Sequence, residues 1–459
     1  MNFKITPEVL AENDKQGPRY TSYPTAVEFN SDFGKEQFIL QLKEADQNAN
    51  TPLSLYIHIP FCKTRCSFCG CYTHILKNEN QIEKYVDSLI REISLLKEVL
   101  KNRNKIAQLH FGGGTPSILS DNQIAKLLTK IKSSFVLTEN GEVAIEVNPS
   151  SITLDKISFL KEQGFNRISF GVQDLDSNVL DHIGRPQTEE QIKSTFSHSK
   201  KLGFKSVNMD LIYGLPGQTV TQFENTIDKV IKISPDRVAL YSFAYLPKIM
   251  SNQSSIKDSS LPKREDKFAM FASAYKKFMS QGYVQIGMDH FAKKDDDLSV
   301  AKEKGTLFRN FMGYTVSPHR EMLGIGASSI GYINGAFYQN SKNLKEYESL
   351  INTNTLPVVK GYKLTDDDKY RQFVITSLMC NFKINYNDFY KQFKVNFEDY
   401  FKNELEELDK QRKTALPFTI KGDETLTATN AGSVFIRNIC MTFDAYLKEK
   451  KGTSFSKTV

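Results

Sequence analysis

The chain has 459 residues, of which 40% are hydrophobic and 25% charged, with six cysteines and a formal net charge of +7. This length is too great for one ordinary hydrophobic core and predicts a large catalytic domain with additions. The positive charge is spread along the chain and forms no basic stripe, which argues against a nucleic-acid partner.

The beginning of the chain lacks the apolar segment of a secretory signal. No apolar run reaches the roughly 18 residues that would indicate a membrane span. We therefore expect a cytoplasmic monomer with no membrane span. In a reducing compartment, six cysteines in a chain of this length do not indicate a disulfide scaffold.

Short β-rich runs alternate with helical patterns from residue 53 onward. Strands are predicted at 53–59, 106–111, 142–147, 167–172, 206–214 and 237–244. Helices are predicted at 81–100, 122–135, 154–164, 189–203 and 220–233. Strands and helices at this pitch predict an α/β fold of parallel strands with right-handed crossovers. Six such units favour a barrel, or an incomplete one, over an open sheet.

The pattern loosens after residue 245. A helix is expected at 263–283, a strand and loop at 284–293, and a glycine-rich segment over the barrel mouth at 305–335. Further helices are expected at 366–382, 386–411 and 431–450, around a hairpin at 418–429. This C-terminal region contains the acidic stretch NELEELDK (403–410), which argues against DNA binding. We therefore interpret the region as a structural cap or a substrate lid.

These patterns divide the chain into four expected parts. They are an N-terminal extension (1–50), a partial barrel (51–250), a barrel extension with substrate-covering loops (251–360) and a mainly helical, winged-helix-like C-terminal domain (361–459).

Four of the six cysteines lie in the stretch CKTRCSFCGC (62–71), directly after the first predicted strand. Cys62, Cys66 and Cys69 form a C-x3-C-x2-C pattern, which can hold three corners of a four-iron cluster and leave the fourth iron open. Zinc prefers four ligands from two separated pairs, and here the fourth would be Cys71 or His74 in cramped geometry. The spacing favours the iron–sulfur cluster over zinc, and Cys71 is not assigned as a ligand.

Other unusual residues follow the ends of the predicted strands, where ligands bind in such folds. The turn GGGTP (112–116) follows the second strand and Gln173 follows the fourth. Glu146 closes the third strand, Asp210 lies in the fifth and Ala244 ends the sixth. Two histidines each have two interpretations: His58 is either a core residue or a neighbour of the cluster, and His290 is either a proton donor or a structural hydrogen-bond partner. Cys380 and Cys440 lie on apolar helical faces and are interpreted as core thiols.

The cysteine loop after a first strand, followed one strand later by a glycine turn, resembles the radical S-adenosylmethionine (SAM) superfamily, which is known for a partial (β/α)6 barrel. The resemblance extends from about residue 15 to 455 and is carried by the following stretches: GPRYTSYPTAVEF (17–29), LSLYIHIPFC (53–62), CSFCGC (66–71), LHFGGGTPS (109–117), NRISFGVQD (166–174), DLIYGLPGQT (210–219), IGMDHFAK (286–293), RNFMGYT (309–315) and RNICMTFDAYL (437–447). Within the superfamily the chain is similar to the oxygen-independent coproporphyrinogen III oxidases (dehydrogenases) of haem biosynthesis.

The resemblance implies an oxidoreductase that oxidatively decarboxylates two propionates of coproporphyrinogen III to vinyl groups, giving protoporphyrinogen IX. A [4Fe-4S] cluster and SAM would form a 5′-deoxyadenosyl radical, with electrons from a flavodoxin-type donor and an unknown final acceptor. The family is known to hold two SAM molecules. Its positions carry over to Tyr56, Gly113, Glu146 and Ile330 for the first. For the second they carry over to Phe68, Gly114, Thr115, Gln173, Arg185, Asp210 and Ala244.

One residue departs from the family pattern. After Phe311 the family usually has glutamine, whereas this chain has Met312. This departure keeps open one alternative, a radical SAM enzyme that methylates a tetrapyrrole or opens the haem ring. A second alternative is a haem chaperone with the same barrel, against which the N-terminal segment PRYTSYPT (18–25) and the full-length C-terminal domain argue. No residue is assigned as catalytic.

Overall fold

The computed structural model describes residues 5–316, 320–414, 416–449 and 455–458. Its helices are α1 (Pro7–Asn13), α2 (Lys35–Asp46), α3 (Glu79–Val99), α4 (Asp121–Ser134), α5 (Leu154–Glu162), α6 (Ser177–His182), α7 (Glu189–Lys201), α8 (Val220–Ile233), α9 (Arg264–Ser280), α10 (Asp297–Glu303), α11 (Leu344–Asn352), α12 (Asp366–Asn381), α13 (Tyr386–Phe393), α14 (Phe397–Tyr400), α15 (Lys402–Arg412), α16 (Asn430–Val434), α17 (Ile436–Thr442) and α18 (Ala445–Glu449). Its strands are β1 (Leu53–Ile59), β2 (Phe61–Cys62), β3 (His74–Ile75), β4 (Lys105–Gly113), β5 (Val136–Val147), β6 (Arg167–Gln173), β7 (Ser206–Tyr213), β8 (Arg237–Ser242), β9 (Tyr283–Ile286), β10 (His290–Lys293), β11 (Phe308–Asn310), β12 (Gly313–Thr315), β13 (Met322–Ile325), β14 (Ile330–Ile333), β15 (Ala336–Asn340), β16 (Val358–Lys363), β17 (Lys383–Asn385), β18 (Thr419–Lys421) and β19 (Thr425–Ala428).

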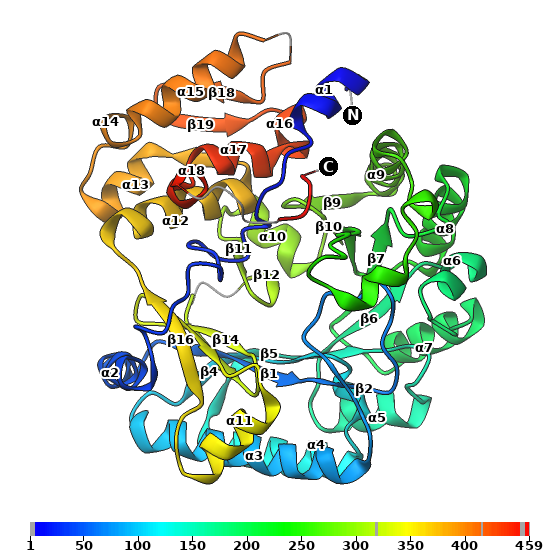
Figure 1. The fold of residues 1–459 in the computed structure, drawn as a ribbon, viewed down its shortest axis with the longest axis vertical. Coiled ribbons are helices and arrows are strands. Elements are labelled where there is room, and N and C mark those ends of the chain that lie inside the picture. The colour runs from blue at the N-terminus through cyan, green and yellow to red at the C-terminus, as the bar shows by residue number, and fades with distance from the viewer. Residues whose placement is uncertain (1–4, 317–319, 415, 450–454, 459) are drawn as a thin grey trace.

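The six predicted strands are all present and form the centre of one sheet. In the described residues this sheet has the strand order β16-β15-β14-β13-β1-β4-β5-β6-β7-β8-β10-β9. Each pair from β1 to β8 is parallel. The intervening helices pack on the outer face, with α3, α4, α5 and α7 along the lower and right edges of Figure 1. The predicted α/β fold with a partial barrel is confirmed.

Alternation along β1 explains how the barrel acquires two different faces. Leu53, Leu55 and Ile57 are completely buried in the main hydrophobic core. The residues between them point to the opposite face because side chains alternate along a strand. On that inner face β1 presents Tyr56 and His58, so the same strand supplies both core contacts and polar groups for the barrel interior.

The segment 305–335 is more than a covering loop. Strand β13 pairs in parallel with β1, with Tyr56 opposite Gly324, and therefore extends the barrel sheet. Strands β14, β15 and β16 continue the sheet in antiparallel fashion. Only the β11–β12 hairpin stands apart from it, and residues 317–319 lie outside the described residues.

Several predicted boundaries were wrong. Strand β4 continues through Gly113, so the glycine turn begins inside the strand, and Gln173 ends β6 instead of following it. Ala244 lies two residues beyond the end of β8. The helix expected at 386–411 is three helices, because Lys394 adopts a left-handed conformation (φ 58°) and Asn396 then caps α14. The helix expected at 431–450 is likewise divided into α16, α17 and α18.

The N-terminal segment packs against the C-terminal helices. Tyr20 and Tyr23 belong to the hydrophobic cluster formed mainly by residues of α12–α17. Arg437 donates hydrogen bonds to the carbonyls of Gly17 and Pro18 (3.0 Å for Pro18) and of Lys457 (2.7 Å). Figure 1 shows the N-terminal segment passing between the C-terminal helices and the barrel. This segment therefore forms one wall of the space between them.

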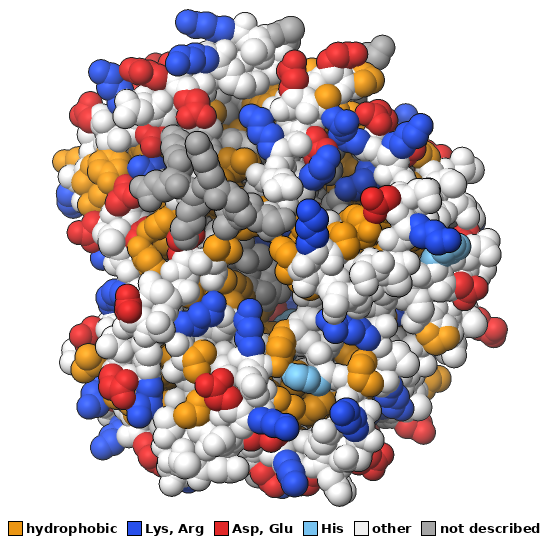
Figure 2. Space-filling model, viewed as in Figure 1, with side chains coloured by type: hydrophobic (Ala, Val, Ile, Leu, Met, Phe, Trp, Pro, Cys, Tyr) orange, Lys and Arg blue, Asp and Glu red, His pale blue; other side chains and the backbone are white. Residues whose placement is uncertain are grey.

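The face in Figure 2 is hollowed between the C-terminal helices and the sheet, and hydrophobic side chains lie along the edge of the hollow. Among the described helices, none combines the length and the apolar character needed to cross a membrane.

Candidate functional site

The cysteine loop lies at the end of β1, where the main chain forms a short parallel pairing between β2 and β3. Cys62, Cys66 and Cys69 are all partly buried and none forms a disulfide. Burial raises the pKa of the Cys62 and Cys66 thiols. Cys71 is exposed. The loop thus presents three thiols at one end of the barrel.

Two side chains from the short 3-10 helix Ser251–Ser255 hold this backbone in place. Asn252 Nδ2 donates to the carbonyl oxygens of Cys66 (3.2 Å), Ser67 (3.0 Å) and Cys69 (2.9 Å). Gln253 Nε2 donates to the carbonyl oxygens of Phe68 (3.0 Å) and Ala244 (3.1 Å). Gln253 thus links Phe68 and Ala244, two residues that the family resemblance assigns to the second SAM molecule.

The glycine turn approaches the cysteine loop so closely that side chains are excluded. Gly114 N donates to the Ile59 carbonyl (2.8 Å), and a Cβ on Gly114 would lie 3.0 Å from Cys62 Sγ and 2.7 Å from the Phe61 carbonyl oxygen. Thr115 Oγ1 lies 3.4 Å from Cys62 Sγ. Gly113 has φ +119°, a conformation that favours glycine. These contacts explain why this turn needs glycine beside a thiol.

Glu146 is the centre of a polar group inside the barrel. Its Oε1 lies 2.9 Å from His110 Nε2, and its Oε2 accepts from Gly113 N at 3.2 Å. Tyr56 stands beside the same carboxylate, because a Cβ on Gly112 would contact both Tyr56 and Glu146 at 2.8 Å. The structure therefore brings together three of the four positions carried over for the first SAM molecule.

His58 is more firmly placed than the sequence indicated. Its Nδ1 lies 3.1 Å from the Tyr56 hydroxyl and its Nε2 lies 3.2 Å from the Tyr72 carbonyl oxygen. Burial lowers the pKa of His58 to about 4, so the imidazole is neutral near pH 7. It positions Tyr56 and the residues that follow the cysteines.

The fourth position, Ile330, lies on the adjoining strand β14. A Cβ on Gly324 of β13 would meet the Ile330 carbonyl oxygen at 2.4 Å, and Gly324 is paired with Tyr56. Ile330 is thus two strands away from Tyr56, on the same part of the sheet.

A second group of predicted residues surrounds Gly171 on β6. A Cβ on Gly171 would lie 2.9 Å from Gln173 Nε2 and 3.0 Å from Arg185 Nη2. Arg185 also donates to the Gly171 carbonyl, and its Nη1 lies 3.9 Å from Cys66 Sγ. Gln173 has φ +69°, which directs the chain away from the strand direction at the barrel mouth. The arginine thus connects this group to the cysteine loop.

Asp210 lies on the neighbouring strand, paired with Gly171. It accepts hydrogen bonds from Ser169 Oγ (3.1 Å) and Asn208 Nδ2 (2.7 Å). Burial, followed by repulsion from Glu146, raises the pKa of Asp210 to about 6. Phe68 is partly buried and packs against the hydrophobic cluster that includes Val179 and Phe243.

The barrel interior contains a cavity that these polar side chains share. Its lining includes His110, Glu146, Asp210, Tyr241, His290 and Met312. Nδ1 of His290 lies 2.7 Å from the Asp289 carboxylate. Met312 and Gly313, at the turn of the β11–β12 hairpin, close one side of the cavity. The residue that departs from the family pattern therefore faces the barrel interior.

The donor set fits an iron–sulfur cluster. The three thiols are free, and an arginine whose Nε is buried without a hydrogen-bond partner among the described residues lies beside Cys66. No three His, Cys, Asp or Glu side chains of the described residues gather as a site for one metal ion.

Sequence reasoning missed Asn252, Gln253 and His110. The first two lie in the short 3-10 helix Ser251–Ser255, whose polar sequence carries no periodicity. Their hydrogen-bond partners in the cysteine loop are more than 180 residues away along the chain. His110 lies on a predicted strand, and its position next to Glu146 follows from the parallel pairing of β4 with β5.

Comparisons with known proteins agree with this geometry. Residues 56–230 match the family model "Radical SAM superfamily", and residues 364–416 match "HemN C-terminal domain". The chain is 41% identical over 453 residues to the oxygen-independent coproporphyrinogen III oxidase of Escherichia coli (strain K12), covering 98% of each chain. It is 39% identical over 461 residues to the enzyme of that name from Synechocystis sp., covering 99% of this chain and 98% of the relative.

A solved structure, described as coproporphyrinogen III oxidase (HemN) from Escherichia coli, a radical SAM enzyme, superimposes with a TM-score of 0.89. The match is 39% identical and covers 94% of this chain and 100% of the other.

Proposed function

The chain belongs to the oxygen-independent coproporphyrinogen III oxidase family of radical SAM enzymes, and from this premise we propose how its residues serve that reaction. The activity is the anaerobic oxidative decarboxylation of coproporphyrinogen III to protoporphyrinogen IX in haem biosynthesis. When bound, the cluster and SAM would supply the radical chemistry that removes hydrogen from each reacting propionate, and an external electron acceptor would take the electron released with CO2 as the vinyl group forms.

We propose that Cys62, Cys66 and Cys69 hold the cluster. The observation that carries this assignment is the double restraint on the cysteine loop: the glycine turn contacts it from one side, and Asn252 fixes three of its carbonyls from the other. A loop held in this way keeps its thiols in position before the cluster binds, which lowers the entropic cost of binding.

The first SAM molecule is proposed to contact Tyr56, Gly113, Glu146 and Ile330. Glu146 is suited to a cationic amino group because it is an anion at the barrel mouth with one oxygen already oriented by the Gly113 amide. His110 holds the other oxygen, so the carboxylate cannot rotate freely. His110 therefore orients the Glu146 carboxylate before SAM binds.

A second SAM molecule is proposed beside the first, at Phe68, Gly114, Thr115, Gln173, Arg185, Asp210 and Ala244. Arg185 offers a guanidinium that can pair with a carboxylate in two-point fashion, and Asp210 can accept from hydroxyl groups. Gly171 leaves the space between Gln173 and Arg185 free of a side chain. These are the features that support a second site.

The remaining assignments are also proposals. The protein would act as a cytoplasmic monomer with a flavodoxin-type electron donor. Its four parts would be the extension (1–50), the barrel (51–250), the barrel extension (251–360) and the C-terminal domain (361–459).

The proposed function is tested by anaerobic incubation of the reconstituted protein with SAM, a reductant and coproporphyrinogen III. The expected result is release of CO2 and formation of the divinyl product, with the matched variant Cys66→Ala inactive. Failure of the parent protein to form the divinyl product while its cluster is intact would overturn the assignment of substrate.

A further inference from the structure

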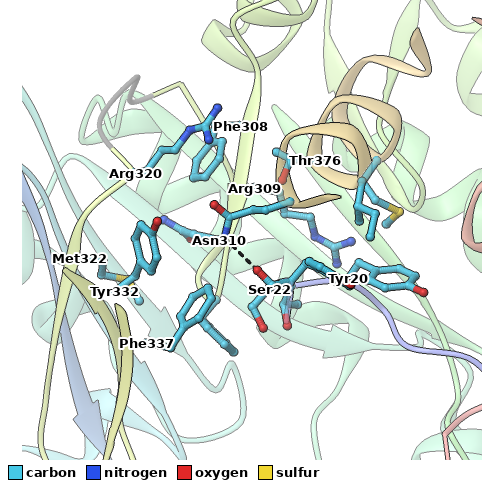
Figure 3. Close-up of a pocket in the computed structure, with 16 residues that line it drawn as sticks. Tyr20, Ser22, Phe308, Arg309, Asn310, Arg320, Met322, Tyr332, Phe337 and Thr376 are labelled. Carbon is cyan, nitrogen blue, oxygen red and sulfur yellow. Dashed lines mark hydrogen bonds between the residues drawn. The ribbon is translucent and has the colours of Figure 1, made fainter. Parts of the chain in front are cut away.

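A second cavity lies outside the barrel, between the N-terminal segment, the β11–β12 hairpin, the sheet extension and α12. Figure 3 shows side chains from all four of these elements pointing into it. Its lining consists of Tyr20, Thr21, Ser22, Tyr23, Phe308, Arg309, Asn310, Phe311, Arg320, Met322, Tyr332, Phe337, Gln372, Ile375, Thr376 and Met379. The walls are thus mainly aromatic and apolar, and this cavity is called the aromatic pocket below.

Two residues that line the aromatic pocket, Arg309 and Asn310, carry polar hydrogens with no acceptor among the described residues. Asn310 is 7% exposed, and its Nδ2 has no hydrogen-bond partner, whereas its Oδ1 accepts from Met312 N at 2.8 Å. Arg309 Nε is buried and also without a partner. A buried amide NH2 group without an acceptor is unfavourable, so this group favours a ligand that carries hydrogen-bond acceptors.

Arg320 adds a cation to the same pocket. Its guanidinium lies over the Phe308 ring at 5.3 Å, and it forms no hydrogen bond or ion pair with any other described residue. Burial lowers the pKa of Arg320. None of the residues lining the pocket is acidic. A cation in an apolar setting without a counter-charge is a site for an anion.

The β11–β12 hairpin separates the aromatic pocket from the barrel cavity. Arg309 and Asn310 of β11 line the aromatic pocket, whereas Met312 and Gly313, only two or three residues later, line the barrel cavity. A ligand that is larger than either cavity can therefore contact both sides of one short hairpin. A macrocycle with several carboxylate side chains has this size and this charge.

We infer that the aromatic pocket binds one carboxylate-bearing pyrrole of the tetrapyrrole substrate, with Arg320 pairing its propionate and Asn310 Nδ2 donating a second hydrogen bond. This inference rests on the proposed function and assigns the substrate a second anchor outside the barrel. The aromatic walls contact the ring, and the guanidinium selects a carboxylate. A propionate held here is not the one that reacts in the barrel.

The test measures binding separately from turnover. Coproporphyrin III, the stable oxidised form of the ring, is titrated into the reconstituted protein under anaerobic conditions, and binding is followed by the shift of the porphyrin absorption band. Arg320→Gln is expected to weaken binding by about tenfold or more, because a charged hydrogen bond is lost. Arg320→Lys, which keeps the charge, recovers part of the affinity.

Asn310→Asp provides a second, independent variant. It keeps the oxygen that accepts from Met312 N but replaces the donor with a second carboxylate oxygen, so binding of coproporphyrin III is expected to weaken by at least as much. Arg91→Gln, at an exposed arginine that contacts Asn354, is the matched control and should change affinity less than twofold. Circular dichroism and iron content establish that each variant is folded, and Asn310→Asp decides the test if Arg320→Gln does not fold.

Affinities of Arg320→Gln and Asn310→Asp within twofold of the parent would overturn the inference, as would absence of binding by the parent. Kinetics provide the second readout: Arg320→Gln should raise KM for coproporphyrinogen III with kcat nearly unchanged. Failure of the proposed function looks different, because then the parent binds coproporphyrin III in an Arg320-dependent way but forms no divinyl product.

Discussion

The Oε1 atom of Glu146 lies 2.9 Å from Nε2 of His110, inside the barrel and next to the glycine turn. Burial lowers the pKa of His110, yet the hydrogen bond and the charge of Glu146 outweigh burial, so the net pKa of His110 is raised. The pair therefore keeps a carboxylate oriented at the barrel mouth, with its second oxygen on the Gly113 amide.

Replacing Glu146 with glutamine is expected to weaken SAM binding by about tenfold to a hundredfold, because the carboxylate proposed to pair with the cationic amino group of SAM is lost. Equilibrium binding of SAM to the reconstituted protein measures the effect. Glu139→Gln changes an exposed carboxylate on the same strand and should leave SAM affinity unaltered. Equal affinities for the parent and Glu146→Gln would contradict the role assigned to Glu146.

Cys71 is expected to be dispensable for the cluster. It is exposed, whereas Cys62, Cys66 and Cys69 are partly buried. Cys71→Ala should therefore retain iron and sulfide at the level of the parent after anaerobic reconstitution and gel filtration. Cys69→Ala, two residues earlier, should lose most of both. A large loss of iron in Cys71→Ala would show that the fourth cysteine of the stretch is a ligand.

Asn252 is expected to control retention of the cluster without contacting it. Its amide NH2 group is shared by three carbonyls of the cysteine loop, and Asn252→Asp would replace that donor with an oxygen that repels them. The variant should lose iron to a chelator several times faster than the parent. Ser254→Ala, in the same short helix but bonded only to the Ser251 carbonyl, is the control. Equal rates of iron loss from Asn252→Asp and the parent would show that the cysteine loop keeps its conformation without the Asn252 amide.

The strands and helices that were predicted from the sequence are those whose hydrophobic residues recur with the period of a strand or a helix. Strand β1 carries Leu53, Leu55 and Ile57 on one face, and this alternation identified the strand and the loop that follows it. Strand β13 was not identified because its four residues are too short to show a period and its pairing with β1 is formed across more than 260 residues. Strand β13 therefore forms because it pairs with β1, a tertiary contact that no local sequence pattern indicates.

The candidate site divides in the same way. The cysteines and the glycine turn were found because both follow predicted strands and have distinctive spacing. Asn252 and Gln253 were not found, since an amide in a short polar 3-10 helix gives no local sign of the distant carbonyls to which it donates. The break at Lys394 was missed for a related reason: a left-handed residue that is not glycine has no signature in the sequence.

Glu92 predicts a pH dependence of stability. It is completely buried and accepts hydrogen bonds from Gly326 N (2.9 Å), Asn340 Nδ2 (2.7 Å) and the Tyr347 hydroxyl (2.6 Å), with burial raising its pKa to about 7. Because the folded pKa exceeds the unfolded one, the folded state binds the proton more tightly. The contribution of Glu92 to stability is therefore complete below about pH 4.5 and is lost as the pH rises through 7.

Glu92→Gln removes this titration and should flatten the pH dependence. Asn340 Oδ1 is buried without a partner among the described residues, so rotation of the Asn340 amide lets it accept from the new glutamine NH2 group. The melting temperature of the variant relative to the parent should rise between pH 5 and pH 8, by an amount equivalent to about 1–3 kcal/mol. A difference that is constant across this range would show that Glu92 keeps an ordinary pKa.

Arg185 is expected to determine how many SAM molecules bind. Its Nη1 lies 3.9 Å from Cys66 Sγ, its Nε has no hydrogen-bond partner among the described residues, and Gln173 lies beside it above Gly171. Replacing it with glutamine removes the two-point partner for a carboxylate but leaves Glu146 and the glycine turn intact. Equilibrium dialysis with labelled SAM should therefore give two molecules per chain for the parent and one for Arg185→Gln, with the affinity of the remaining molecule within about threefold. Arg65→Gln, at an exposed arginine of the same cysteine loop, should still bind two. One molecule per chain in the parent, or two in Arg185→Gln, would contradict a second site at this arginine.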